Sequence, residues 1–286
     1  MLLHDHSDLL THPDERLIRS FHWVIKLRRA RWILTLHDET LLERFPAWPE
    51  DARTSYVRFL KWPEHIICVS DRIHSFLVQL GVSRERLTSI SPLLPLRAIA
   101  TSPLPVDVQN FLAAHTPVIT AIGAFNSNYD FLTLARALAR IVQKYPSAGF
   151  VLIDAGFTLD VPYREAVLQA LENSPGREHL VLSKVPHDQV FQILCKSAVL
   201  VRGVRRESFG LSRVEAILMG TPVVATKAGE TRYMTLYEYG DHEDLAGKVC
   251  MVLRSGPDLT EAQTFFKKMG EETLDQILKV YETSTH

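Results

Sequence analysis

The sequence is poor in the features that mark secreted, membrane-spanning and metal-binding proteins. It holds three cysteines, Cys68, Cys195 and Cys250, which stand in apolar surroundings without paired or metal-type spacing. We therefore expect reduced core thiols and a cytoplasmic protein. No apolar run reaches about 18 residues, which excludes a membrane-spanning helix. The N-terminus lacks a basic segment followed by an apolar run and a cleavage site, so we expect no secretory signal.

The charge balance and the absence of two nucleotide-binding motifs exclude further classes of protein. The formal net charge is −1 and the pI is near 6.9, so no overall basic field draws the chain to nucleic acid. A Gly-x-Gly-x-x-Gly motif follows none of the expected strands, which counts against an NAD-type site, and the Gly-x-x-x-x-Gly-Lys-Ser/Thr loop of NTPases is absent. The 286 residues, 46% hydrophobic and 23% charged, fit a soluble globular protein of two ordinary domains.

Residues 1–95 predict a small set of strands and helices. The apolar run 32–36 predicts a buried parallel strand, and we expect further strands at 65–70 and 87–90. Residues 14–31 carry an apolar stripe typical of a helix, and residues 44–63 predict a loop with a short helix. Ser70 or Asp71 is expected to cap a helix that ends at Gly81.

Three groups of polar residues in this region have two interpretations each. His4, Asp5 and His6 can be a metal cluster or the exit of a first strand, and no second cluster at helical spacing supports the metal. His37 follows a strand at its carboxyl end, where ligands collect in α/β sheets, but a structural role is equally compatible with the sequence. The cations at 26, 28, 29 and 31 suit either a helix C-terminus or an anionic membrane surface.

The second half of the chain alternates strands and helices strictly. Four prolines lie between residues 91 and 115, which we interpret as an interdomain crossover with its linker at 96–115. Strands are expected at 116–123, 150–153, 180–182, 199–201 and 223–225. Helices are expected near 131–144, 163–171, 187–195, 245–253 and 260–281. This alternation predicts a parallel, doubly wound sheet in a domain over 116–265, followed by a C-terminal helix at 266–286 that packs back on the first domain.

The stretch from Arg202 to Ala225 organises this second domain. It reads RGVRRESFGLSRVEAILMGTPVVA and places Glu207 and Glu215 eight positions apart, around a Phe-Gly-Leu bend and a helix. At 1.5 Å per residue, eight positions span roughly 12 Å, so one carboxylate lies at the helix N-terminus and the other two turns further in. The free backbone N–H groups between them suit an anion such as a diphosphate. Two glutamates eight positions apart are, by themselves, typical of a solvated helix face. The sequence that surrounds them here favours a binding site instead.

These residues resemble the donor-binding domain of the retaining glycosyltransferases of family 4, which have the GT-B fold. The matching pieces are Glu207-Ser-Phe-Gly-Leu…Glu215-Ala, Gly220-Thr-Pro-Val-Val-Ala, Gly229-Glu230 and Tyr239-Gly-Asp-His-Glu-Asp-Leu-Ala. Residues 35–38 and 65–92 also resemble parts of that family's first domain. The resemblance implies two Rossmann-like doubly wound domains that face a cleft.

The resemblance also implies roles for individual residues. Glu215 would accept hydrogen bonds from the ribose hydroxyls, and Glu207 would hold hydroxyls of the donor sugar. The N–H groups of Phe209, Gly210 and Leu211 would face the diphosphate or the sugar. His37 would contact the donor sugar across the cleft, so His37 and Glu207 are the candidate catalytic residues. Stabilisation of the leaving diphosphate is the main chemical requirement.

The remaining donor contacts would come from loops. Gly123 and Asn126 lie in the loop after the first strand of the second domain, and Lys184 lies in a loop placed to recognise the base. No metal and no cofactor are expected beyond the nucleotide-diphosphate sugar itself. The expected reaction transfers a sugar to a glycan or lipid-linked glycan with retention at the anomeric carbon, the leaving phosphate taking the acceptor's proton.

The chain departs from the family pattern in a loop that carries cations in other members of the family. Family members carry two cations after the first strand of the second domain, where residues 123–130 here have none. Two lost charge-assisted hydrogen bonds remove roughly 1.5–3 kcal/mol each. Arg202, Arg205, Arg206 and Lys227 flank the glutamate motif, and the hypothesis is that Arg205 or Arg206 replaces the missing cations. The alternative is that both are surface cations on a loop.

The second departure is the length of the first domain, about 95 residues where this fold usually has well over 150. A shortened domain would leave a strand edge near residues 2–4, which self-association, a partner subunit or a genuinely smaller acceptor domain would cover. The alternative function is therefore an inactive or partner-dependent glycosyltransferase-like subunit that binds nucleotide or glycan. A nucleotide-sugar epimerase fits the Phe-Gly-Leu string less well. Expected partners are the donor and the acceptor, with peripheral contact to the inner face of a membrane as a further alternative.

Overall fold

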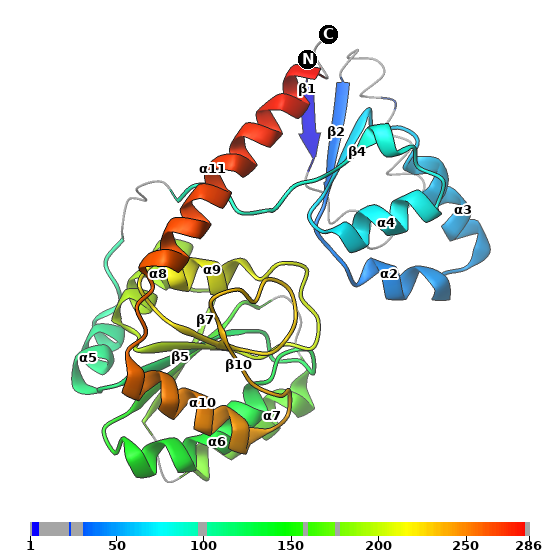
Figure 1. Cartoon of the computed structure of the whole chain (residues 1–286). Helices are drawn as coiled ribbons and strands as arrows, with labels where there is room; N and C mark the ends of the chain where they lie inside the picture. The colour runs from blue at the N-terminus through cyan, green and yellow to red at the C-terminus, as the bar shows by residue number, and fades with distance from the viewer. Residues whose placement is uncertain are drawn as a thin grey trace. The chain divides into compact units, whose positions relative to one another are not determined.

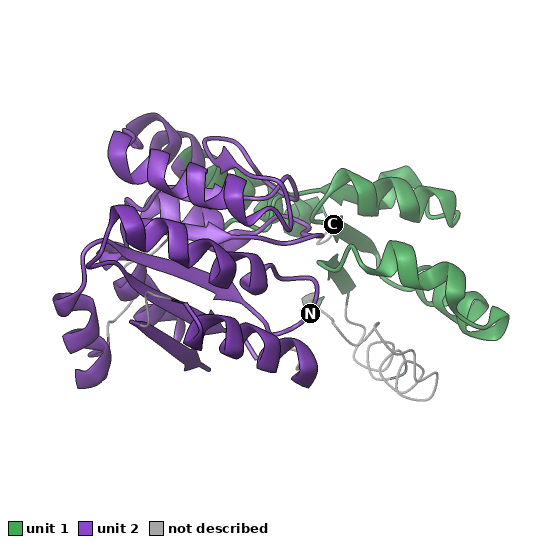
Figure 2. Ribbon diagram, turned by 90° about the horizontal axis from the view of Figure 1, so that it is seen from below, with its two compact units in different colours: residues 1–95, 268–286 green, residues 96–267 purple. Residues whose placement is uncertain are grey.

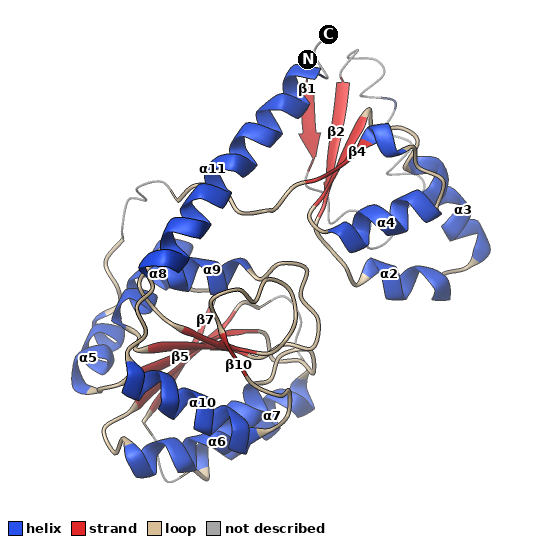
Figure 3. Ribbon diagram, in the orientation of Figure 1, coloured by secondary structure: helices blue, strands red, loops and turns tan. Residues whose placement is uncertain are grey.

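Two parallel β-sheets form the framework of the chain (Figure 3). The structure, a computed structural model, describes residues 2–5, 23, 31–96, 102–156, 160–174 and 178–283. Residues 1–95 and 268–286 form unit 1, and residues 96–267 form unit 2 (Figure 2). Helix α11 (Thr260–Thr283) runs through the division at residue 267, and helix α5 (Val106–Ala114) occupies part of the expected linker.

The sheet of unit 1 has four parallel strands in the order β1-β2-β3-β4 within the described residues. The strands are β1 (Leu2–Asp5), β2 (Arg31–Leu36), β3 (His65–Cys68) and β4 (Leu87–Ser89). Strand β2 is buried from its second residue to its end, so both faces of the sheet are covered. The expected strands of this region are confirmed.

Helices cover one face of this sheet with an aromatic core. They are α2 (Leu41–Arg44), the 3₁₀ turn η2 (Phe45–Ala47), α3 (Glu50–Phe59) and α4 (Asp71–Gln79), and a second 3₁₀ turn, η3 (Arg84–Arg86), leads into β4. Trp32, Leu34 and Leu36 point to this face because side chains alternate along a strand. Ser70 caps α4, since its Oγ accepts a hydrogen bond from Ile73 N at 3.3 Å.

The opposite face of the unit 1 sheet packs against the end of α11. Val280 joins Ile33, Ile67 and Ile90 in a small buried cluster. His4 lies beside this cluster, with its ring nitrogens 2.5 Å from Tyr281 Oη and 2.6 Å from Thr35 Oγ1. These hydroxyl partners give His4 a structural role in the described residues, where no group of three metal-ligating side chains occurs.

The sheet of unit 2 has six parallel strands in the order β10-β9-β8-β5-β6-β7 within the described residues. They are β5 (Val118–Gly123), β6 (Gly149–Asp154), β7 (His179–Ser183), β8 (Val199–Arg202), β9 (Val223–Ala225) and β10 (Thr235–Leu236). Counted from β7 this is the strand order 3-2-1-4-5-6 of doubly wound domains, which confirms the expected fold class. The direction of winding reverses between β5 and β8.

Helices cover both faces of this sheet (Figure 1). Helices α6 (Phe131–Lys144), α7 (Val161–Glu172) and α10 (His242–Ser255) bury the main core on one face. Helices α8 (His187–Lys196) and α9 (Leu211–Leu218) lie together on the other. No helix in the described part of the chain combines the length and apolarity needed to cross a bilayer.

The structure corrects three details of the sequence interpretation. Arg31, expected at a helix C-terminus, is the first residue of β2, while residues 14–22 and 24–30 lie outside the described residues. Cys195 is exposed, unlike the buried Cys68 and Cys250, because it lies on the solvent side of α8. Strand β10 was not expected, because its flanking residues 226–238 are polar and give two residues of strand no periodic signal.

Candidate functional site

The glutamate motif lies at the point where the unit 2 sheet reverses its winding. Strand β5 ends at Gly123 and its neighbour β8 ends at Arg202. Loop 124–130 leaves the first strand and loop 203–210 leaves the second. In open α/β sheets ligands bind outside the carboxyl ends of the strands at such a switch point. This end of unit 2 is therefore the candidate site.

The two loops are joined along their length by hydrogen bonds. Tyr129 and Val204 form an antiparallel bridge, and Arg205 N donates to Asn128 O at 2.9 Å. The Asn128 side chain donates to Arg206 O and accepts from Arg206 N, each at 3.1 Å. These contacts satisfy the backbone of both loops and fix one loop against the other.

Glycine is required at the root of each loop because other side chains fill the space. A Cβ at Gly123 would lie 2.7 Å from Cδ1 of Tyr129. A Cβ at Gly203 would lie 2.0 Å from Tyr237 Oη and 2.5 Å from Asp130 Cβ. Asp130 is buried, and its Oδ2 accepts hydrogen bonds from Tyr237 Oη at 3.0 Å and from Gly240 N at 2.9 Å.

Glu207 lies in the turn that precedes α9. Gly210 caps this helix in the left-handed conformation, with φ +88°, which favours glycine. The Glu207 carboxylate is held by Arg202, whose Nη2 donates to Oε2 at 2.7 Å. The Phe209 carbonyl accepts from Glu230 N at 2.8 Å, so loop 226–232 packs on the same turn. The turn therefore has a carboxylate on one side and the positive end of a helix on the other.

Arg202 is itself a buried link between the strands at the switch point. Its side chain is 9% exposed, and Nη1 donates to Ile122 O of β5 at 2.5 Å. The guanidinium also lies 4.9 Å from the centre of the Tyr129 ring. The cation thus contacts both loops and Glu207.

Glu215 lies in the second turn of α9 and is 8% exposed. Its Oε1 lies 2.9 Å from Nε2 of His187, the first residue of α8. Burial raises the pKa of Glu215, while the neighbouring His187 and Arg202 oppose that rise. A buried carboxylate with one exposed partner is suited to accept hydrogen bonds from hydroxyl groups of a ligand.

The other sequence-derived candidates are distributed over the loops around this turn. Phe209 is half-buried, Gly210 is buried and Leu211 is exposed. Arg205 is exposed and stacks on Tyr239, with its guanidinium 4.8 Å from the ring centre, and Arg206 is exposed. Lys184 is exposed just after β7 in the left-handed conformation, and Asn126 Oδ1 accepts from Asn128 N at 3.0 Å.

His37 belongs to unit 1, where it directly follows β2 with an exposed side chain. Its expected contact with the donor sugar stays a prediction.

Sequence reasoning missed two residues at this site, His187 and Arg213. His187 lies 28 positions before Glu215, at the start of a different helix. Arg213 sits inside the motif and is fully buried, whereas arginine is ordinarily a surface residue. The signal that could have singled it out is a cation between Leu211 and Val214, at a position that the helical pattern turns inward.

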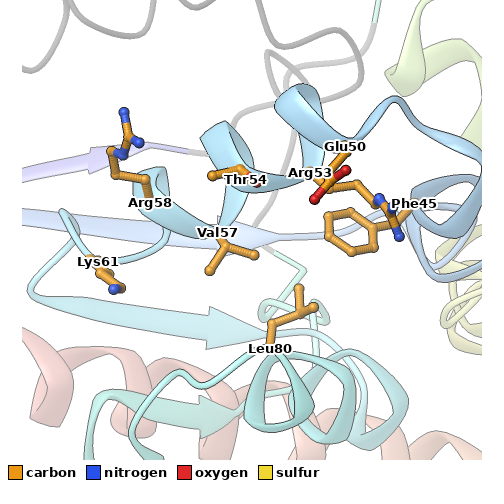
Figure 4. Close-up of a pocket in the computed structure, with 8 residues that line it drawn as sticks. All are labelled: Phe45, Glu50, Arg53, Thr54, Val57, Arg58, Lys61 and Leu80. Atoms are coloured by element: carbon orange, nitrogen blue, oxygen red, sulfur yellow. The ribbon is translucent and has the colours of Figure 1, made fainter.

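Unit 1 carries an open groove of about 540 Å³ along α3 (Figure 4). Phe45, Val57 and Leu80 give it an apolar floor, and Arg53, Arg58 and Lys61 gather at its sides. None of the sequence-derived candidate residues lines it. The candidate donor site therefore remains at the switch point of unit 2.

The comparisons with known proteins cover the unit that holds this candidate site. Residues 116–255 match the family model of the glycosyl transferases group 1. The phosphatidylinositol N-acetylglucosaminyltransferase gpi3 subunit of Schizosaccharomyces pombe is 25% identical over 232 residues, covering 77% of this chain and 48% of that protein. The chain thus spans about half of the length of this curated relative.

Solved structures resemble nearly the whole chain. HepE from Anabaena, in complex with UDP and glucose, has a TM-score of 0.73 at 18% identity, over 99% of this chain and 78% of that one. Sucrose-phosphate synthase from Thermosynechococcus elongatus has a TM-score of 0.67 at 19% identity, over 99% and 73%. At these identities the structures show the fold, which is GT-B. Together with the family model they support a glycosyltransferase.

Proposed function

We propose that this chain transfers a sugar from a nucleotide-diphosphate sugar to a glycan or lipid-linked glycan, with retention of the anomeric configuration and without a metal ion. The observation that carries the proposal is the position of Glu207 and Glu215 around the N-terminus of α9, at the switch point of the unit 2 sheet. The likeness to a UDP complex and to a lipid-directed N-acetylglucosaminyltransferase subunit supports a donor and an acceptor of these classes.

Each carboxylate would bind a different part of the donor. Glu215, buried in α9, would accept hydrogen bonds from the ribose hydroxyls, and Glu207 would hold hydroxyls of the transferred sugar. The N–H groups at Phe209, Gly210 and Leu211 would face the diphosphate, where the helix end favours negative charge. Gly123 and Asn126 would border the donor, and Lys184 would lie beside the base.

The reaction would need a stabilised leaving group rather than a side-chain nucleophile. The bond between the anomeric carbon and the diphosphate oxygen breaks, and a bond from that carbon to the acceptor hydroxyl forms on the same face. The hydroxyl proton passes to the leaving phosphate. Positive charge around the diphosphate would therefore contribute most of the rate enhancement, and His37 would contact the sugar beside the reacting carbon.

A second candidate function is a partner-dependent or inactive subunit that binds nucleotide or glycan. Two observations favour it: residues 123–130 lack any cation, and the curated relative is named as a subunit. For either function we also propose that the chain associates with a partner chain or a second copy of itself. We further propose that it contacts a membrane surface.

One experiment separates the two functions. The chain is incubated with UDP-, GDP- and ADP-sugars, donor hydrolysis is followed by release of the free nucleotide, and thermal shifts are recorded with UDP, GDP and ADP. Hydrolysis together with a thermal shift supports the transferase. A thermal shift without turnover in any acceptor mixture supports the subunit, and the absence of both contradicts both functions.

A further inference from the structure

Arg213 has unused hydrogen-bond donors in the interior of unit 2. The residue is 0% exposed, and its Nη1 donates to the carbonyls of Ala228 and Glu230. Its Nε and Nη2 have no hydrogen-bond partner among the described residues. Buried guanidinium donors are normally paired, because an unpaired buried donor is strongly destabilising.

Arg202 repeats this pattern a short distance away. Its Nη1 and Nη2 are bound to Ile122 O and to Glu207, but its buried Nε has no partner in the described part of the chain. The two guanidinium groups interact electrostatically, since Arg202 is among the groups that lower the pKa of Arg213 after burial itself. Three donors of two neighbouring cations are therefore unsatisfied.

The carboxylates around this pair do not satisfy these three donors. Glu207 is bound to Arg202, while Glu230 is bound to Arg232 through several short contacts. Asp130 is occupied by Thr133, Tyr237 and Gly240. Burial lowers the pKa of Arg213 to about 10, so the group stays protonated at neutral pH. Arg213 is therefore a charged group whose Nε and Nη2 no described carboxylate binds.

Arg213 lies directly beneath the N-terminus of α9. A Cβ added at Gly210 would lie 3.2 Å from Cδ and 3.3 Å from Nε of Arg213. The positive end of the helix and the buried cation therefore act on the same turn, and in low-dielectric surroundings the effect of a charge is strengthened. The neighbouring loop 123–130 contributes no cation.

We propose that Arg202 and Arg213 form the cationic part of a diphosphate site, in which their buried, incompletely paired guanidinium groups favour a diphosphate bound at the turn Phe209–Leu211. This inference rests on the proposed function and deepens it. Two buried arginines thus take the role that the sequence assigned to the exposed Arg205 or Arg206. Both act as positioning residues, through the turn and through their electrostatic field.

The test measures the selectivity for phosphate rather than affinity alone. Arg213→Met, Arg213→Lys, Arg202→Met and the wild type are titrated by calorimetry with UDP, GDP and ADP, the matching nucleosides, and inorganic pyrophosphate. Arg213→Met is expected to weaken binding of the diphosphate ligands by about tenfold or more, and to leave nucleoside binding unchanged. Arg213→Lys keeps the charge and should restore most of the affinity.

Arg254→Met is the matched control, because Arg254 is an exposed cation near the end of α10. It should leave every affinity unchanged. Equal losses for nucleosides and diphosphates in Arg213→Met would overturn the inference, since they indicate a purely structural role. Unchanged diphosphate binding in both Met variants would also overturn it.

Pyrophosphate separates this inference from the proposed function. The wild type could bind pyrophosphate but no nucleotide, with weaker pyrophosphate binding in Arg213→Met. In that case the diphosphate site stands and the nucleotide-sugar function fails. If Arg213→Met does not fold, the same selectivity measured for Arg202→Met and Arg213→Lys decides the question.

Discussion

Nε2 of His187 lies 2.9 Å from Oε1 of Glu215, and this contact joins the first residue of α8 to the second turn of α9. The glutamate side chain is 11% exposed and the histidine side chain 62% exposed. His187 also packs against Phe191, with ring centres 4.4 Å apart. An exposed ring therefore partners the buried carboxylate to which we assign the ribose hydroxyls.

Glu215→Gln should weaken nucleoside binding. The change keeps the size of the side chain but removes its charge, and hydrogen bonds to a charged group contribute about 1.5–3 kcal/mol. We expect affinity for UDP, GDP or ADP and for the matching nucleoside to fall together, by about 10- to 100-fold. Calorimetry with both ligands measures this.

Glu172→Gln is the control for that prediction, because Glu172 is an exposed residue of the same type at the end of α7. It should bind every ligand as the wild type does. Selective loss of diphosphate binding in Glu215→Gln, with nucleoside binding kept, would contradict the assignment of Glu215 to the ribose.

The stability of the chain should depend on pH through the same glutamate. Burial raises the pKa of Glu215 in the folded chain. Between its ordinary value and the raised value the folded chain holds more protons than the unfolded chain, so the free energy of unfolding falls as pH rises through this window. Glu215→Gln removes this contribution.

Urea unfolding from about pH 4 to pH 7 measures the effect. The difference in free energy of unfolding, variant minus wild type, should increase as pH rises through this window. A difference that stays constant or decreases would show that His187 and Arg202 outweigh burial at this carboxylate.

The architecture of unit 2 could be predicted because its signals are local. Each buried strand is a short apolar run, and each is followed by a helix with an apolar stripe, as at Leu134, Leu138 and Ile141 of α6. The same holds in unit 1, where Ser70 was one of two expected caps and is the one that the structure uses, because its Oγ reaches Ile73 N. Periodicity and capping are properties of neighbouring residues, and a single sequence contains them.

The partners within the site could not be predicted in the same way. The pairing of Glu215 with His187, and the burial of Arg213 under Gly210, depend on how helices pack and not on local pattern. Sequence reasoning treated the cations near the motif as surface groups or ligands according to their position along the chain. It could not distinguish the exposed Arg205 and Arg206 from the buried Arg202 and Arg213.

Glu207→Gln should separate sugar binding from nucleotide binding. The amide keeps an acceptor for Arg202 but loses the charge that we assign to the hydroxyls of the transferred sugar. We expect affinity for the donor sugar nucleotide to fall by about 10- to 100-fold, while affinity for the free nucleotide stays within about threefold of the wild type. The ratio of the two affinities, measured by calorimetry, is the readout. Equal losses for both ligands would mean that Glu207 supports the turn and does not contact the sugar.

Gly203→Ala should destabilise unit 2, whereas Gly247→Ala should stabilise it. A methyl group at Gly203 would lie 2.0 Å from Tyr237 Oη, so it must displace the hydrogen bond from Tyr237 to Asp130. Overpacking of this kind lowers the free energy of unfolding by about 1–3 kcal/mol. A methyl group at Gly247, inside α10, meets nothing within 4 Å, and alanine is favoured over glycine there by about 0.5–1 kcal/mol. Urea unfolding of both variants measures the two effects. If close packing at the switch point fixes loop 203–210 against Asp130, the two changes in free energy of unfolding must have opposite signs. Changes of the same sign would mean that the loss of glycine itself causes the effect.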